Sequence, residues 1–111
     1  MSNLFLKNNK NISQFERAVY EALLAVPGGK VISYGDLAKK AGFPKAARAV
    51  GSALNKNPFA PRVPCHRVVK SSGEVGGFAH GTERKIAILQ KEGVKIEKGR
   101  IVEFVKKRFC C

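Results

Sequence analysis

The sequence predicts one small α/β domain, mostly helical, with a helix-turn-helix and a few short β-strands. Three observations support this fold class. The chain has 111 residues, the length of about one domain. Two helix-capping patterns each precede apolar residues at helical spacing, and short β-prone runs lie between the expected helices. We expect residues 12–105 to form the domain, residues 1–11 a flexible arm and residues 106–111 a tail.

The first expected helix begins with a capping box at Ser13-Gln14-Phe15-Glu16. In this pattern the serine hydroxyl and the glutamate carboxylate each accept a hydrogen bond from a backbone amide at the helix start. Apolar residues recur every three or four positions, at Ile12, Phe15, Val19, Leu23 and Val26. Pro27-Gly28-Gly29 then ends the helix.

The next two expected helices form the helix-turn-helix. Val31-Ile32 is extended, and Ser33 to Asp36 is a second possible capping box that opens a helix over residues 33–41. Gly42 fits the end of that helix, and Pro44 suits the first turn of a second helix over residues 44–56. A short glycine-containing turn between two helices is typical of a helix-turn-helix, here in a winged-helix-like domain.

The second half of the chain alternates short elements. Residues 57–64 contain three prolines and form a stiff loop. Arg67-Val68-Val69 is β-prone, and Thr82 to Glu92 predicts a helix with Gly93 as its cap. Residues 94–105 predict two short strands around Lys98-Gly99.

The charge balance points to a polyanionic partner. Lys and Arg total 21 and Asp and Glu total 8, which gives a net charge of +13 and an isoelectric point near 10.1. Nucleic acid is the commonest polyanion bound by such domains, although a lysine-rich surface also serves solubility alone. The second helix of the pair carries Lys45 and Arg48 among small residues, which would let a duplex approach closely. An ordinary helical hairpin in a core is the alternative.

The chain contains three cysteines and no CxxC motif, so no zinc ribbon or thioredoxin-like site is predicted. Cys110 and Cys111 are expected to be free thiols on a frayed tail, and we expect no metal and no cofactor. The absence of a disulfide framework suits a reducing cytoplasm. No apolar run is long enough to cross a membrane, and the first residues do not form a signal peptide.

Cys65-His66 is the candidate chemical centre. A thiol becomes a strong nucleophile as thiolate, which a nearby base promotes. Adjacent side chains on an extended backbone point opposite ways, so His66 is expected to act on Cys65 through a bridging water. A carboxylate that fixes the imidazole tautomer would make His66 a better base. A buried structural cysteine next to a core histidine is the simpler alternative.

Pro64-Cys65-His66-Arg67-Val68 resembles the active-site motif of the O6-alkylguanine-DNA alkyltransferases. The resemblance extends, in family order, over roughly residues 13–95. Its other segments are Val31 to Ala38 before the first helix of the pair, Ala46 to Gly51 in the recognition helix, Asn57-Pro58 at the hinge, Gly73 to Gly81 in the substrate-pocket loop, and Glu92-Gly93.

The resemblance implies a role for each matching residue in the chemistry. Cys65 resembles the alkyl acceptor, His66 the water-mediated base, Glu92 the carboxylate that orients it, and Asn57 the hinge residue that braces the active-site turn. The substrate-binding set is Tyr34, which helps rotate the nucleotide, the Val68 carbonyl, the Ala79 amide, and Phe78, which stands where some relatives have tyrosine.

The resemblance also implies a DNA-binding surface. Arg48 resembles the finger that fills the space left by the rotated nucleotide. The remaining expected DNA-binding residues are Ala47, Ala49, Lys45, Gly51 and Ser33. The implied partner is double-stranded DNA containing O6-alkylguanine, bound in the minor groove by a monomer. Because the flipped base would meet a thiol and the product would be a thioether, the protein is expected to act once.

Two other functions compete with this one. Family members commonly carry an N-terminal domain, for which this sequence leaves about a dozen residues, and this short length resembles the alkyltransferase-like proteins. Those proteins bind alkylated guanine and flag it for excision repair without transfer, usually with another residue, often tryptophan, in place of the nucleophile. Cys65 argues against that assignment. A helix-turn-helix transcription factor is the third possibility, but the alanine-rich helix offers few side chains that read bases.

Overall fold

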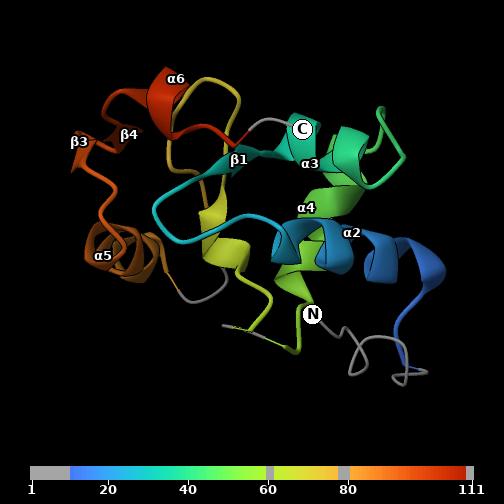
Figure 1. Cartoon of the computed structure of the whole chain (residues 1–111). Coiled ribbons are helices and arrows are strands. Elements are labelled where there is room, and N and C mark those ends of the chain that lie inside the picture. The colour runs from blue at the N-terminus through green and yellow to red at the C-terminus, as the bar shows by residue number, and fades with distance from the viewer. Residues whose placement is uncertain (1–10, 60–61, 78–80, 110–111) are drawn as a thin grey trace.

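Two hydrophobic cores lie on either side of a two-stranded parallel sheet in the computed structural model, which describes residues 11–59, 62–77 and 81–109. In Figure 1 the helices α2, α3 and α4 lie on one side of the sheet, and α5, β3, β4 and α6 lie on the other. The strands are β1 (Ile32–Ser33) and β2 (Val68–Val69), with Ile32 opposite Val68. Successive side chains of a strand point to opposite faces, so Ile32 and Val68 enter the first core, while Val31 and Val69 enter the second.

The first core is built on α2 (Gln14–Leu24). The predicted capping box is present: the Glu16 amide donates to Ser13 Oγ at 3.0 Å, and the Ser13 amide donates to Glu16 Oε1 at 2.8 Å. Val19 and Leu23 are fully buried, as their spacing predicts. Within the described part of the chain, none of the helices has the length and apolar character needed to cross a membrane.

The helix-turn-helix consists of α3 (Tyr34–Lys40) and α4 (Ala47–Asn55). Gly42, at φ +94°, ends α3: its amide donates to Lys39, and the Phe43 amide donates to the Ala38 carbonyl at 2.8 Å. These are the two hydrogen bonds of a Schellman motif, which needs a residue in the left-handed conformation.

The second helix begins three residues later than the sequence predicts. The Ala46 amide donates to the Phe43 carbonyl at 3.0 Å, so Pro44 and Lys45 form the middle of a turn instead of the first turn of α4. Proline at the second position of such a turn is favoured because its φ is already correct. The predicted helix over residues 44–56 is therefore shorter, and Lys45 lies in the turn.

The second half contains a 3-10 turn, η1 (Cys65–Arg67), then β2, α5 (Thr82–Lys91), β3 (Ile96–Glu97), β4 (Arg100–Ile101) and α6 (Phe104–Lys107). The strands β3 and β4 pair antiparallel, as predicted for residues 94–105. The second predicted strand ends early, because Glu103 is in the left-handed conformation and precedes a helical turn. The prediction of a mostly helical α/β domain with a helix-turn-helix is confirmed.

The segment predicted as a tail from residue 106 begins inside α6 and packs on the domain. The Val31 amide donates to the Lys107 carbonyl at 2.9 Å, and the Phe109 amide donates to the Val31 carbonyl at 2.6 Å. Arg108 pairs with Asp36 at 2.7 Å, and Phe109 packs against the first core. Residues 106–109 thus extend the parallel sheet at β1. The predicted arm at residues 1–10 and the cysteines at 110 and 111 lie outside the described residues.

Replacing Ser33 with alanine tests the junction between β1 and the helix-turn-helix. Ser33 is 1% exposed, and its Oγ accepts the Asp36 amide at 3.1 Å. We expect Ser33→Ala to lower the free energy of unfolding by about 1 kcal/mol, because the capped amide loses its acceptor. Urea unfolding measures this loss. Ser52→Ala, at an exposed position of α4, is the control and should change stability far less. Equal stability of Ser33→Ala and the unmodified protein would contradict the capping role.

Candidate functional site

A braced loop presents Cys65 at the boundary of the first core. Asn57 donates from Nδ2 to the Val63 carbonyl at 2.9 Å, and its Oδ1 accepts the Phe59 amide at 3.0 Å. One side chain thus holds both ends of the proline-rich loop. Cys65 follows as the first residue of η1 and is 8% exposed. Asn57 therefore lies where the sequence predicts a brace for this turn.

The backbone at Cys65-His66 is a 3-10 turn and not the predicted extended strand. The Arg67 amide donates to the Pro64 carbonyl at 3.0 Å, which closes the turn. Successive side chains of a 3-10 helix diverge by about a third of a turn. The prediction of an extended backbone at Cys65-His66 is therefore wrong, but the two side chains still point in different directions.

Tyr34, the first residue of α3, packs against the first core, and Cys65 is one of the buried residues of that core. Burial raises the pKa of the half-buried Tyr34 phenol, and the charge of a Cys65 thiolate raises it further. Tyr34 therefore keeps its proton near neutral pH. Its ring also lies against Gly51 of α4, where an added Cβ would be 3.9 Å from Tyr34 Cε1.

Glu92 connects His66 to Arg67. His66 Nε2 lies 3.1 Å from both Glu92 oxygens. Arg67 donates from Nε to Oε1 at 3.1 Å and from Nη2 to Oε2 at 2.6 Å, and its Nη1 donates to the Val26 carbonyl at 2.8 Å. Burial alone would raise the pKa of Glu92, but the hydrogen bonds and charges of Arg67 and His66 outweigh it and lower that pKa. Glu92 is therefore an ionised acceptor.

The ionised carboxylate decides which nitrogen of His66 carries a proton. Both Glu92 oxygens accept, so Nε2 is the protonated nitrogen and Nδ1 remains basic. Burial of His66 lowers its pKa, and the charges of Arg67 and Lys85 add to this, whereas Glu92 acts in the opposite direction. The lowering effects prevail, so the imidazole is neutral at pH 7 and can accept a proton at Nδ1.

The end of α5 places Glu92 at this position. Gly93, at φ +96°, closes the helix: its amide donates to Gln90, and the Val94 amide donates to the Leu89 carbonyl. This is a second Schellman motif, with Glu92 as the C-cap residue. The predicted Glu92-Gly93 helix end is confirmed.

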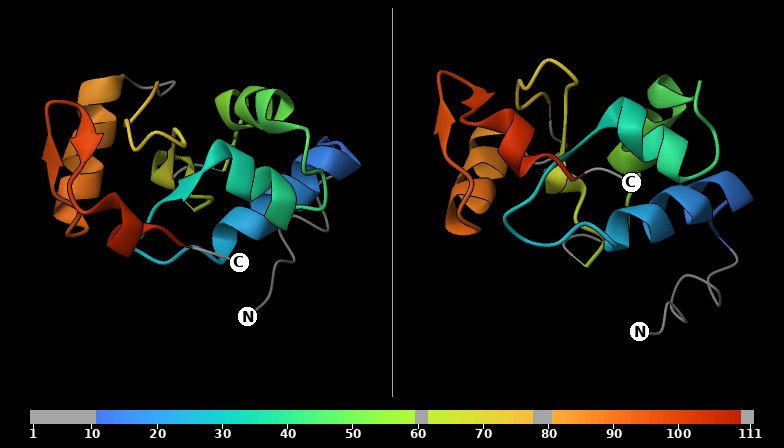
Figure 2. Two further views of the ribbon diagram at one scale, coloured as in Figure 1. Left: turned by 90° about the horizontal axis from the view of Figure 1, so that it is seen from above. Right: turned by 45° about the horizontal axis from the view of Figure 1, so that its top comes forward.

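The residues predicted to bind DNA are only partly on the surface. Arg48, Ala49 and Lys45 are exposed, and Ala47 and Gly51 are half-buried on α4. Ser33 is buried as the cap of α3, so its side chain does not join this surface. In the left view of Figure 2, α4 lies along the upper edge with residues 70–77, and α6 lies at the opposite edge.

The predicted substrate-binding residues other than Tyr34 are Val68, Phe78 and Ala79. Val68 is buried at the start of β2, and its amide donates to the Cys65 carbonyl. Phe78 and Ala79 lie outside the described residues. Sequence reasoning assigned no role to Arg67 or Lys85. For Lys85 a signal existed: it lies four residues before Leu89, on the apolar stripe of its helix.

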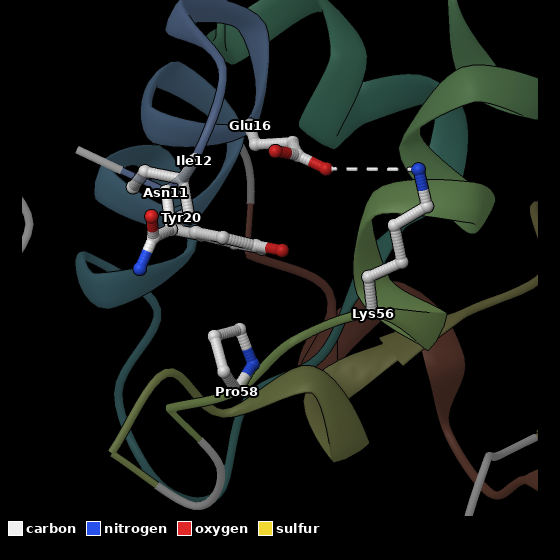
Figure 3. Close-up of a pocket in the computed structure, with 6 residues that line it drawn as sticks. All are labelled: Asn11, Ile12, Glu16, Tyr20, Lys56 and Pro58. Carbon is white, nitrogen blue, oxygen red and sulfur yellow. Dashed lines mark ion pairs between the residues drawn. The ribbon is translucent and has the colours of Figure 1, made fainter. Parts of the chain in front are cut away.

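A separate pocket of about 210 Å³ opens between the start of α2 and the end of α4. Figure 3 shows Glu16 and Lys56 facing each other there, 3.9 Å apart, with Tyr20 and Pro58 nearby. The Tyr20 hydroxyl is already bonded to the Ala53 carbonyl at 2.7 Å. None of the predicted site residues lines this pocket. Among the described residues, no group of three or more His, Cys, Asp or Glu side chains could hold a metal ion.

Comparison with known proteins identifies the family. The family described as "6-O-methylguanine DNA methyltransferase, DNA binding domain" matches residues 14–94, a range that includes Cys65, His66 and Glu92. The chain belongs to this family. The methylated-DNA–protein-cysteine methyltransferase of Mycobacterium leprae is 46% identical over 80 residues, which is 72% of this chain and 48% of that protein. The protein of the same name from Salmonella typhimurium is 49% identical over 79 residues, 71% of this chain and 46% of its own length.

Solved structures of two kinds share the fold. OGT of Mycobacterium tuberculosis in complex with DNA superposes with a TM-score of 0.72 at 46% identity, covering 74% of this chain and 51% of that one. Atl1 of S. pombe, in complex with damaged DNA containing O6-carboxymethylguanine, gives 0.80 at 30% identity, covering 91% of this chain and 99% of that one. The chain thus spans about half the length of the curated relatives it matches and nearly all of Atl1.

The contact between His66 and Glu92 predicts a pH response. In the unmodified protein, His66 should titrate below about 6.5, because burial favours the neutral ring. Glu92→Gln should lower the His66 pKa further, because it removes the carboxylate that favours the imidazolium. NMR titration of the imidazole measures both values, with His80→Gln used to assign the resonances.

Glu97→Gln is the matched control. It neutralises an exposed carboxylate on β3 and should leave the His66 titration unchanged. A His66 pKa that stays constant or rises in Glu92→Gln would show that the carboxylate does not act on the imidazole.

Proposed function

We propose that this protein binds duplex DNA containing O6-alkylguanine and transfers the alkyl group to Cys65. The observation that carries this proposal is the 3.1 Å contact of His66 with the ionised Glu92, directly after a buried thiol. Such an assembly prepares a nucleophile, whereas a purely structural cysteine has no use for it. We further propose that the protein acts as a monomer in the cytoplasm, where thiols stay reduced.

The proton leaves Cys65 before the alkyl group arrives. Through a bridging water, the thiol proton passes to Nδ1 of His66, and Glu92 stabilises the imidazolium that forms. The thiolate then attacks the alkyl carbon in line with the bond to O6. The sulfur–carbon bond forms, the carbon–oxygen bond breaks, and its electron pair passes to the guanine. The proton held by His66 returns through solvent to the departing base.

Tyr34 supports the departure of guanine in this proposal. Its raised pKa keeps the hydroxyl protonated, so it can donate a hydrogen bond to the flipped base as negative charge develops. The Val68 carbonyl and the Ala79 amide would recognise the guanine edge next to Phe78, by resemblance to the family. No cofactor takes part, and the thioether product does not revert, so each molecule reacts once.

The DNA would be held by α4. Its exposed Arg48 and the small side chains of Ala47 and Ala49 suit close approach to a duplex, and we propose that the helix enters the minor groove. The reacting carbon lies inside the base stack, so the nucleotide must rotate out to reach the buried sulfur. Arg48 would occupy the space that the base leaves.

Recognition without transfer is the second candidate function. The similarity to Atl1 favours it, since it covers 91% of this chain and 99% of that protein. Cys65 favours transfer, because the alkyltransferase-like proteins usually carry another residue at the nucleophile position. The two functions differ in a single observable, the mass of the protein after it has met the lesion.

The unmodified protein should gain one methyl group, about 14 Da, when incubated with a duplex containing O6-methylguanine, because the thiolate becomes a thioether. Intact-mass spectrometry measures the gain, and peptide mapping should place it on Cys65.

Cys65→Ala is the control. It should gain no mass and still bind DNA, because the proposed DNA-binding helix α4 is separate from the turn η1 that carries Cys65. If the unmodified protein binds the lesion with full occupancy and its mass stays constant, transfer is excluded and recognition without transfer replaces it.

Arg48→Ala should slow methyl transfer about tenfold or more, while binding to unmodified duplex weakens only slightly, because Arg48 acts after the base has left the stack. Transfer rates at saturating protein and fluorescence anisotropy with unmodified duplex separate the two effects. Lys45→Ala removes an equal exposed charge from the neighbouring turn. It should weaken binding and its salt dependence without slowing transfer at saturation. Identical behaviour of the two variants would remove Arg48 from the finger role.

A further inference from the structure

Lys85 is a buried lysine that faces the site from α5. It is 1% exposed, and its Nζ donates to the Val75 carbonyl at 2.7 Å and to the Gly77 carbonyl at 3.1 Å. Among the described residues, no carboxylate lies within ion-pair distance of this ammonium group. Two of its three N–H donors are thus used on neutral backbone oxygens, and the third remains for another acceptor.

One face of α5 carries both Lys85 and Glu92. The two residues are seven positions apart, which is two helical turns, and Leu89 lies between them on the same stripe. This face packs against η1, the turn that carries Cys65 and His66. The helix therefore presents a cation from one point of the stripe and an anion from its end to the same turn.

Burying an ammonium group without an anion raises the free energy of its charged form, which lowers its pKa. Burial lowers the pKa of Lys85 to about 8, and the charge of a Cys65 thiolate acts against this lowering. A methionine would fill the same space without the desolvation penalty. The two backbone hydrogen bonds of Lys85 offset part of this penalty, and they leave one N–H and the positive charge available to another partner.

Three other titratable groups around the sulfur, two tyrosines and a histidine, are neutral at pH 7. Tyr20 from α2 and Tyr34 from α3 have raised pKa values, about 12 for Tyr20, and the Cys65 thiolate contributes to both. His66 is neutral because burial lowers its pKa. Arg67 is charged, but its guanidinium donates hydrogen bonds to Glu92 and to the Val26 carbonyl. Lys85 is therefore the cation among these groups that is left to face Cys65.

We propose that Lys85 is a positioning residue whose ammonium group stabilises the Cys65 thiolate and whose two backbone hydrogen bonds hold residues 75–77 against α5. No bond to Lys85 forms or breaks: the thiol proton leaves towards His66, and the ammonium keeps all of its protons. This inference rests on the proposed function, because a stabilised thiolate is useful only if Cys65 is a nucleophile.

The pH dependence of Cys65 alkylation by iodoacetamide tests the charge. The tryptic peptide of residues 63–67 reports on Cys65 alone, separately from Cys110 and Cys111. Lys85→Met should move the midpoint of the rate profile up by about one pH unit, because a nearby cation favours the thiolate. Lys85→Arg should stay closer to the unmodified protein, since it keeps the charge. Arg84→Met, which removes an exposed charge from the same helix, should leave the midpoint unchanged.

A folded Lys85→Met protein, judged by circular dichroism, with an unshifted midpoint would overturn the proposal and leave Lys85 a structural role only. A second measurement needs no variant. The titration of Lys85, followed by NMR of its ε-carbon, should move to lower pH after iodoacetamide has converted Cys65 to an uncharged thioether, because coupled groups respond to each other. An unmoved Lys85 titration would equally overturn it.

The same data separate this inference from the proposed function. Absence of methyl transfer together with a shifted midpoint in Lys85→Met would refute transfer and keep the charge role of Lys85. Methyl transfer together with an unshifted midpoint would support transfer and refute the charge role of Lys85.

Discussion

The carboxylate of Glu92 is the contact on which the arrangement of the site depends. It accepts from His66 and, at two oxygens, from Arg67, which in turn reaches the Val26 carbonyl after α2. One ionised group thus joins the end of α5, the turn that carries the thiol and the segment that follows the first helix. The two Schellman motifs and the capping box at Ser13 fix where individual helices begin or end. The Glu92 carboxylate fixes how the end of α5 meets the other two segments. The fold and the proposed chemistry therefore depend on the same carboxylate.

Local signals in the sequence predict much of this fold. Ser13 and Glu16 cap α2 as expected, and Gly42 and Gly93 end α3 and α5 in the left-handed conformation. Such motifs depend on a few neighbouring residues, so they can be recognised without knowledge of the rest of the chain. The family motif around Cys65 indicates the candidate site, and in the structure Glu92 contacts His66 across 25 intervening residues.

The remaining features depend on contacts between distant segments, which local patterns do not encode. Residues 106–109 resemble part of a tail, yet their backbone pairs with Val31 next to β1. The role of Arg67 arises because Glu92 and Val26 meet around it, and Ser33 is buried because α3 begins at a strand. In each case tertiary packing decides between local alternatives of similar energy.

The pairing of β1 with β2 has a consequence for how the protein could be altered. Two residue pairs, Ile32 with Val68 and Ser33 with Val69, connect the start of the helix-turn-helix to the end of the thiol-bearing turn. The distance from the helix pair to the sulfur is therefore fixed by main-chain hydrogen bonds. Surface side chains of α4 can be exchanged without changing this distance, so the proposed contacts with DNA and the depth of the sulfur can be altered independently.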